Sequence, residues 1–422
     1  MAESTEPAPL EPPSAEHTPA PLPHEPVDVI DTVEAYRDAV AKLAAGTGPF
    51  AVDAERASGF RYSQRAYLIQ VYRREAGAFL FDPPAIGDFS ELAAVMAGEE
   101  WILHAASQDL ACLREVGLDP EVIFDTELGA RLAGLPRVGL GTVVEDLLGI
   151  HLAKEHSAAD WSTRPLPQSW LVYASLDVEL LPDLRDAIAQ LLDNAGKSEI
   201  ARQEFDAVLR RETPERLEPW RRLSGIHALR QGRNLAVARE LWQARDDYAR
   251  EIDSAAGRLV PDGSLLAAAR SLPATKRDLA AMKDFNGRAS RSQIDRWWAA
   301  IERGLATSDL PSNRAQGDGV PPPRVWAEKN PEADGRLKRA RAAVIARAEE
   351  LDIPTENVLT PDTLRRVAWA PPAEITAESI GDALASHGAR AWQVAATAQL
   401  IAQAFVDVSQ ETESPEEPDS SE

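Results

Sequence analysis

The chain has 422 residues, enough for two or three domains that each bury a core of their own. Its formal net charge of −23 argues against a protein that coats nucleic acid along its whole surface. A single cysteine, Cys112, excludes both a disulfide framework and a zinc site built on cysteines.

The two ends of the chain differ in composition from the middle. Residues 1–27 hold five Glu, residues 407–422 hold seven acidic residues, and neither segment has a Lys or Arg. Their Pro and Glu content is typical of disordered tails. The first segment lacks the features of a signal peptide, and no apolar run reaches the roughly 18–20 residues of a membrane span. We therefore expect a cytoplasmic protein that does not enter a membrane.

Residues 28–212 have the pattern of an α/β domain. An amphipathic helix is expected at residues 28–45. Four apolar runs with the length of strands follow at residues 49–53, 66–73, 78–83 and 101–106. Further helical patterns occupy residues 107–117, 124–134, 141–149 and about 168–212. Strands that come first and then alternate with helices predict an α/β layer fold, a mixed sheet with flanking helices.

The rest of the chain has all-helical patterns. Helical segments occupy residues 216–304 and 327–406, and the Pro- and Gly-containing segment 305–326 is typical of a linker. A long helix that includes Leu241 leads to a Pro-Asp pair and a short Leu-bearing helix, and the same order follows Leu337. The echo indicates either two related helical modules or a shared composition alone.

Four acidic residues lie in apolar surroundings. Asp53 and Glu55 are two residues apart at the end of the first expected strand, so both carboxylates lie on one side of it. Asp109 and Asp177 lie in apolar helical patterns, and Tyr173 precedes Asp177 by one helical turn. Any one of these acids also fits a solvent-facing stripe. Two unpaired charges at one strand end are costly, however, and therefore indicate a bound cation. Oxygen ligands without a His or Cys cluster favour Mg²⁺ or Mn²⁺ over zinc.

Three ordered segments resemble a known family. They are VDAERA at 52–57, LHAASQDLACL at 103–113 and YASLDVELL at 173–181, and DWSTRPL precedes the third. Over roughly residues 48–195 the chain resembles ribonuclease D, within the group of 3′→5′ exonucleases that share four acids and a tyrosine (DEDDy). The resemblance implies three folded domains. They are a ribonuclease H-like exonuclease domain at 28–212, a helicase-and-ribonuclease-D C-terminal (HRDC) domain at 216–304, and a second HRDC-like domain at 327–406.

The same resemblance implies an activity and a set of roles. The implied enzyme hydrolyses phosphodiesters at RNA 3′ ends, either in the processing of tRNA and other stable RNAs or in RNA turnover. By analogy, Asp53, Glu55 and Asp177 hold one divalent ion and Asp53 with Asp109 holds a second, while Tyr173 orients the attacking water. Two divalent ions can stabilise both the attacking and the leaving oxygen of a phosphodiester. No small-molecule cofactor is expected.

Four basic residues are candidates for contacts with the RNA backbone, although solvated surface charge explains each of them equally well. They are Arg61, Arg65, Lys154 and Arg164. Trp161 is a candidate for stacking on a base.

Arg56 departs from the family pattern, in which an uncharged residue follows the second acid. Its side chain either contacts a phosphate or points to the strand face opposite Glu55, and strand alternation favours the second. His104 lies next to the second motif and is expected to be a core residue or to support the site from behind.

Three functions stay open at the level of sequence. The first is a 3′→5′ exoribonuclease, the second is the same chemistry on the 3′ ends of single-stranded DNA, and the third is a non-catalytic scaffold that binds nucleic acid. The presence of all four acids and Tyr173 weighs against the scaffold. A contact to the ribose 2′-hydroxyl would separate the first two.

Overall fold

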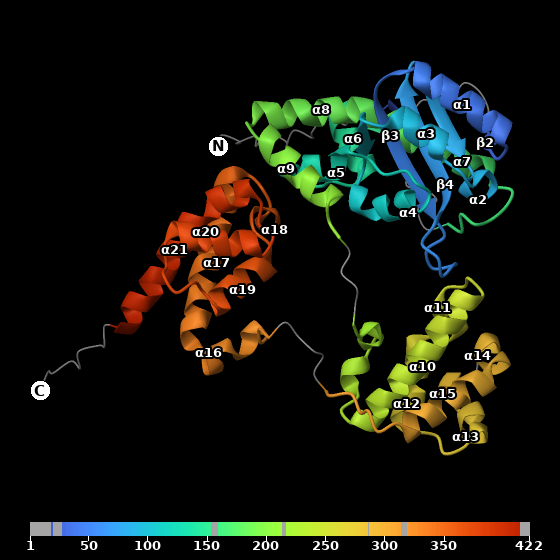
Figure 1. The fold of residues 1–422 in the computed structure, drawn as a ribbon, viewed down its shortest axis with the longest axis vertical. Coiled ribbons are helices and arrows are strands. Elements are labelled where there is room, and N and C mark those ends of the chain that lie inside the picture. Colours follow the sequence, from blue (N-terminus) through green and yellow to red (C-terminus); the bar gives the residue numbers. More distant parts are fainter. Residues whose placement is uncertain are drawn as a thin grey trace, which may run out of the picture.

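The computed structural model describes residues 18–19, 28–152, 159–212, 217–285, 287–313 and 319–413. Figure 1 shows an α/β body at the N-terminal side of the chain, followed by two helical bodies. Among the described helices, none is long and apolar enough to cross a membrane.

The α/β body is built on a six-stranded sheet with the order β2-β5-β4-β3-β6-β7. Its strands are β2 (Val29–Ile30), β3 (Thr47–Arg56), β4 (Ala66–Arg74), β5 (Gly77–Phe81), β6 (Glu100–Leu103) and β7 (Val122–Asp125). Strands β3, β4 and β5 pair antiparallel, whereas β2 with β5, β3 with β6 and β6 with β7 are parallel. The predicted mixed sheet is therefore confirmed, and β3 lies inside it with a hydrogen-bonded neighbour on each side. A short parallel pair, β1 (Thr18–Pro19) with β8 (Ile150–His151), lies outside this sheet.

Helices cover both faces of the sheet (Figure 1). Tyr36 of α1 (Val33–Ala45) packs edge-on against Phe81, with ring centres 5.8 Å apart. The adjacent residue Leu80 points to the other face, where it joins a separate buried cluster with Leu171 of α7 (Gln168–Glu179). The remaining helices of this body are α2 (Pro83–Ile86), α3 (Ser90–Met96), α4 (Leu110–Glu115), α5 (Thr126–Leu132), α6 (Leu140–Leu148), α8 (Leu181–Asn194) and α9 (Ser198–Leu209).

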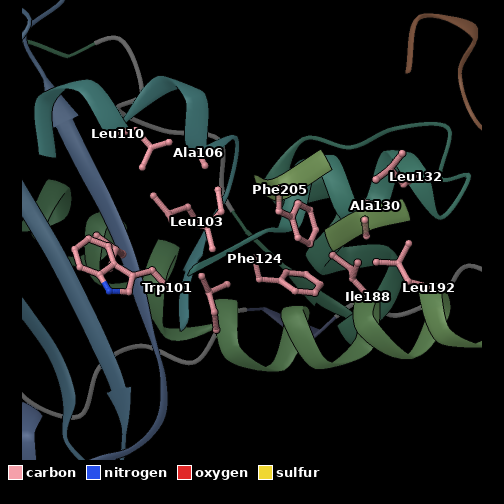
Figure 2. Packing of buried hydrophobic residues seen from close by; sticks show 14 of the residues in the cluster. Trp101, Leu103, Ala106, Leu110, Phe124, Ala130, Leu132, Ile188, Leu192 and Phe205 are labelled. Carbon is pink, nitrogen blue, oxygen red and sulfur yellow. The ribbon is translucent and has the colours of Figure 1, made fainter. Parts of the chain in front are cut away.

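Two strands of the six-stranded sheet were not expected from the sequence. The predicted helix at 28–45 begins only at Val33, because Val29–Ile30 forms a strand parallel to β5. The predicted helix at 124–134 begins at Thr126, because Val122–Asp125 forms the edge strand β7. Short apolar runs of this kind do not reveal by periodicity whether they are helix or strand, and their partners are remote in sequence. Figure 2 shows Phe124 of β7 beside Phe205 of α9, with ring centres 4.9 Å apart.

The two helical bodies share an order of elements. A long helix, a four-residue helix and a helix of nine or ten residues follow one another in each, as α10–α12 and as α17–α19. The first body contains α10 (Gly232–Glu251), α11 (Ala256–Leu259), α12 (Asp262–Ser271), α13 (Lys276–Ala281), α14 (Arg288–Ser292) and α15 (Ile294–Ala306). The second contains α16 (Trp326–Lys329), α17 (Pro331–Leu351), α18 (Thr355–Val358), α19 (Pro361–Trp369), α20 (Ala377–Ser386) and α21 (Ala391–Glu413).

The hydrophobic cores do not follow the order of the three bodies along the chain. The first helical body has a core of its own, built around residues such as Leu241 and Trp297. The buried side chains of the second helical body belong to the same cluster as those of the α/β body. The second body is therefore an extension of the α/β core, whereas the first is an independent unit.

A buried ion pair joins the α/β body to the second helical body. The Arg390 guanidinium donates to both carboxylate oxygens of Glu204, at 2.6 and 2.5 Å, and the indole N–H of Trp392 donates to Glu204 at 2.7 Å. Glu204 is almost fully buried. The ammonium of Lys197 supports the same junction by donating to the carbonyl oxygens of Leu132 and Asp352.

We expect Glu204→Ala to lower the free energy of unfolding by roughly 3–5 kcal/mol, because it leaves a largely buried Arg390 without its partner. Glu199→Ala on the same helix is the matched control, since its pair with Arg202 is exposed and a change there matters little. Urea unfolding followed by circular dichroism measures both variants. Equal unfolding midpoints for the two variants would show that the junction does not stabilise the α/β body.

Candidate active site

The four acids and the tyrosine come from three separate segments. Asp53 and Glu55 lie in the last third of β3, and Asp109 is the residue that precedes α4. Tyr173 and Asp177 lie one turn apart on α7, which packs against β3, β4 and β5. The structure brings all five side chains to the lining of one cleft of about 380 Å³.

Three of the carboxylates are close enough to share an ion. One oxygen each from Asp53, Glu55 and Asp177 lie within 4.8 Å of one another. Asp109 lines the same cleft, and its side chain makes no capping bond to α4, so its carboxylate is available to the cleft. The cleft is lined by Asp53, Ala54, Glu55, Arg56, Ser58, His104, Ala105, Gln108, Asp109, Leu140, Ala159, Tyr173, Asp177 and Leu181.

Burial and mutual repulsion hold protons on these acids. Burial, followed by the charges of Asp53, Asp177 and Asp109, raises the pKa of Glu55 to about 10. The pKa of Asp109 and that of Asp177 are also raised, in each case first by burial and then by Asp53. Burial likewise raises the pKa of Asp53. Four ionised carboxylates in this cleft therefore require added positive charge.

The donor set fits divalent cations that prefer oxygen. The cluster contains carboxylates only, which suits hard ions. Gln70 of β4, directly opposite Asp53 in the strand pairing, is completely buried, and neither of its amide atoms has a hydrogen-bond partner among the described residues. A buried polar amide beside Asp53 is suited to hold a carboxylate in one orientation. Sequence reasoning missed Gln70, although a lone Gln in the apolar run LIQV was the available signal.

Tyr173 is held next to Asp177 in its neutral form. Its hydroxyl is hydrogen-bonded to the Asp177 carboxylate. Burial first, then the charges of Asp177 and Glu55, raise the pKa of the phenol, so the hydroxyl keeps its proton at any physiological pH. A neutral donor and acceptor in an acidic cleft is suited to orienting a water molecule.

Asp125, an acid that the sequence analysis overlooked, fixes the segment that leads to Asp109. Asp125 ends β7 and caps α5, where it accepts from the backbone N–H groups of Glu127 and Leu128. It also accepts from the N–H groups of Ala105 and Ala106, at 3.0 and 2.9 Å. Ala105 has a left-handed backbone (φ 62°), which costs roughly 1–2 kcal/mol for a residue with a Cβ. Asp125 therefore holds the strained turn that carries Asp109. An Asp immediately before a helical pattern was the sequence signal.

Comparison with known proteins supplies the family. Residues 27–193 match the model of a 3′-5′ exonuclease domain, residues 234–301 an HRDC domain, and residues 319–405 the C-terminal domain of a 3′ to 5′ exonuclease. Ribonuclease D of Pseudomonas paraeruginosa is 31% identical over 322 residues, which are 74% of this chain and 82% of the relative. The chain belongs to the ribonuclease D family. The sequence-based prediction of a 3′→5′ exonuclease of this family is confirmed.

Solved structures agree with this assignment. A protein from Bifidobacterium adolescentis is 37% identical with a TM-score of 0.85, over 93% of this chain and all of that chain. Ribonuclease D of Escherichia coli, described as an exoribonuclease involved in structured RNA processing, has a TM-score of 0.67 at 24% identity. The match covers 91% of this chain and 99% of that one, and at this identity it shows a common fold.

Within this family fold, the candidate RNA contacts occupy different surroundings. Arg61 donates to the Ser162 hydroxyl at 2.8 Å, which joins the loop after β3 to the DWSTRPL segment. Arg65 lies 3.7 Å from a carboxylate oxygen of Asp253 in the first helical body. Lys154 lies outside the described residues. A role in RNA binding stays a prediction for all three.

The Arg164 guanidinium is bonded to groups of the protein itself, although 35% of the side chain stays exposed. Its guanidinium donates to Asp82 at 2.6 Å and to the carbonyl oxygens of Trp161, Thr163 and Tyr67 at 2.8 Å each. These bonds fasten the DWSTRPL segment to the sheet. Arg164 as an RNA contact stays a prediction, and RNA would have to share donors that already have partners.

Three side chains near the site, those of Trp161, Cys112 and His104, belong to the protein interior. Trp161 is completely buried, so the suggestion that it stacks on a base is wrong. Burial raises the pKa of Cys112 to about 12, which keeps its thiol unreactive. His104 accepts or donates one hydrogen bond with Thr126, and burial lowers its pKa to about 4. His104 is thus neutral and supports the cleft wall, as expected.

The loop that follows the first two acids is held by the HRDC segment. The Tyr62 hydroxyl donates to Asp246 at 3.0 Å, and Asp253 accepts from the Ser63 backbone N–H at 2.8 Å and from the Tyr67 hydroxyl at 3.2 Å. Figure 1 shows α11 directly beneath this loop. The HRDC body thus contacts the segment adjacent to Glu55 while keeping its own core.

We expect divalent ions to stabilise the folded protein more strongly at about pH 8.5 than at about pH 6. In metal-free protein the raised pKa values make folding weaker as the pH rises from the usual carboxyl range towards about 10, the pKa of Glu55. An ion at about 100 times its dissociation constant adds about 2.7 kcal/mol to the free energy of unfolding. Thermal unfolding with Mn²⁺ or with EDTA measures this.

Asp53→Asn should abolish most of the ion-induced rise in melting temperature and should raise the melting temperature in EDTA, because one repelling charge is gone. Asp186→Asn on α8, exposed and paired with Arg74, is the control and should respond to ions as the wild type does. A full ion response in Asp53→Asn would contradict the proposed ligand set.

Proposed function

We propose that this protein is a divalent-metal-dependent 3′→5′ exoribonuclease that hydrolyses phosphodiesters at RNA 3′ ends. The observation that carries the proposal is the cluster of Asp53, Glu55 and Asp177, whose carboxylate oxygens lie within 4.8 Å of one another beside Asp109 and Tyr173. A buried, purely acidic cluster has no structural use unless cations compensate it. Membership of the ribonuclease D family supports the same chemistry.

Each residue of the cluster has a proposed role. Asp53, Glu55 and Asp177 would hold one Mg²⁺ or Mn²⁺ ion, and Asp53 with Asp109 would hold a second. When bound, such ions supply the positive charge that lowers the pKa of water and stabilises both oxygens of the displacement. Tyr173, hydrogen-bonded to Asp177, orients the attacking water through its hydroxyl.

RNA is the proposed substrate, in stable RNA processing or in RNA turnover. The relatives that match over most of the chain bear the name ribonuclease D, and the Escherichia coli protein is described as processing structured RNA. We also propose Arg61, Arg65 and Lys154 as backbone contacts. The proposed domain limits are those implied by the sequence, 28–212, 216–304 and 327–406.

The test is degradation of end-labelled oligomers by the full-length protein. Matched RNA and DNA oligomers, and an RNA with a single deoxyribose at its 3′ end, separate the exoribonuclease from the same chemistry on DNA. A ladder that shortens from the 3′ end with Mg²⁺ or Mn²⁺ is expected for RNA. Equal rates on all three substrates would overturn the preference for RNA, and binding without any cleavage would favour the scaffold.

We expect Asp177→Asn to slow RNA cleavage by roughly 10³-fold or more, since it removes a ligand from the ions that supply several kcal/mol of transition-state stabilisation. Single-turnover rates measure the effect, and melting temperature in EDTA checks the fold. Wild-type cleavage that persists in EDTA would exclude a metal mechanism.

We expect Tyr173→Phe to slow cleavage by roughly 10²–10⁴-fold while Mn²⁺ affinity stays within a factor of a few, because only the orienting hydroxyl is lost. Tyr72→Phe is the matched control, since Tyr72 is a half-buried tyrosine of β4 outside the cleft. Unchanged turnover in Tyr173→Phe would reduce Tyr173 to a packing residue.

A further inference from the structure

Among the described residues, Arg56 is the one Lys or Arg in the lining of the acidic cleft. Strand alternation predicted that its side chain points away from the face that carries Glu55. That direction stays a prediction, because Ala54, which lies between Asp53 and Glu55, also lines the cleft. The side chain is half-buried. The cleft lining therefore contains a positive charge, at the position where the family pattern has an uncharged residue.

The strand pairing beside Arg56 is irregular. Glu55 pairs with Leu68 of β4, but Arg56 pairs with Ala66, so Tyr67 stands as an extra residue in β4. Such a bulge increases the local twist and bends the strand that carries the extra residue, here β4. The irregularity therefore lies at the end of β3, next to the residues that line the cleft.

Within the described ranges, no ion pair or hydrogen bond involves the side chain of Arg56. By contrast, the buried guanidinium of Arg73 donates to the carbonyl oxygens of Gly48 and Leu43. The guanidinium of Arg164 donates to four oxygens. The charge of Arg56 acts on Asp53, Glu55 and Asp109, where it opposes the larger effect of burial on the pKa. It nevertheless forms no direct pair with any of them.

The charges of the cleft indicate what the guanidinium is for. Four carboxylates and two divalent ions would cancel, and Arg56 would then leave the site with one positive charge. A phosphodiester carries one negative charge, and the planar fork of arginine suits two of its oxygens. We propose that Arg56 is a catalytic residue that binds the non-bridging oxygens of the phosphodiester being hydrolysed. This inference rests on the proposed function of the cleft.

The rival explanation is that Arg56 only balances the four acids. Arg56→Lys separates the two, because it keeps the charge and removes the planar fork. Arg56→Gln removes the charge as well. Arg37→Gln is the control, since Arg37 is an exposed arginine of α1 paired with Glu91, outside the cleft.

Three measurements on the full-length protein test the proposal. Single-turnover cleavage of a short RNA with Mn²⁺ should fall by roughly 10²–10³-fold in Arg56→Gln and by less in Arg56→Lys, the range for removing one group that stabilises developing charge. RNA affinity in EDTA over a salt series should lose about 0.7 from its logarithmic slope in Arg56→Gln, the share of one phosphate contact on single strands. Mn²⁺ affinity by calorimetry should stay equal or tighten in Arg56→Gln.

Two results would overturn the proposal. Arg56→Lys that matches the wild type in all three measurements would show that charge alone matters. Weaker Mn²⁺ binding with a lower melting temperature in both Arg56 variants would show a structural role. The three measurements also distinguish a failure of this inference from a failure of the proposed function. Wild-type protein that binds RNA through Arg56 in EDTA but never cleaves it would refute the nuclease and leave the phosphate contact standing.

Discussion

The crowding of four carboxylates into one buried cleft is the constraint on which the rest of this structure depends. Burial and mutual repulsion raise the pKa of each acid, to about 10 for Glu55, so the protein alone cannot ionise all of them at neutral pH. The cleft reaches its working charge only with bound cations. The same crowding of carboxylates favours the binding of divalent ions and destabilises the metal-free fold. The positive charge of Arg56 partly offsets it.

Much of the surrounding structure holds these charges in place against their repulsion. Strand β3 carries Asp53 and Glu55, both paired with residues of β4, so the two carboxylates cannot move apart without disrupting the sheet. Asp125 fixes the strained turn at Ala105 before Asp109. Arg164 fastens the segment that leads into α7. A cleft assembled from three remote segments keeps its geometry because each segment is anchored by polar groups that lie outside it.

The helical bodies differ in how they relate to this cleft. The second shares a core with the α/β body and is joined to it by the pair of Glu204 and Arg390, so it contributes to the stability of the catalytic fold. The HRDC body has a separate core, against which Tyr62 of the α/β body packs, and polar bonds run from the loop after Glu55 to Asp246 and Asp253. Such contacts can open at a smaller free-energy cost than a shared core, and they lie next to the candidate metal ligands.

The sequence by itself determined the class of the fold and the family, and it singled out the four acids and Tyr173 that the structure brings to one cleft. Motifs of this kind are local, because their residues are set by chemistry at fixed positions on strand β3 and helix α7. Tertiary structure alone decided the two strands Val29–Ile30 and Val122–Asp125, whose pairing partners are remote in sequence. It also decided the buried position of Trp161 and the internal hydrogen bonds of Arg164. Alternation along a strand predicts the direction of a side chain only while the pairing is regular. The bulge at Tyr67 is a property of two strands together, so the sequence of β3 alone could not show it.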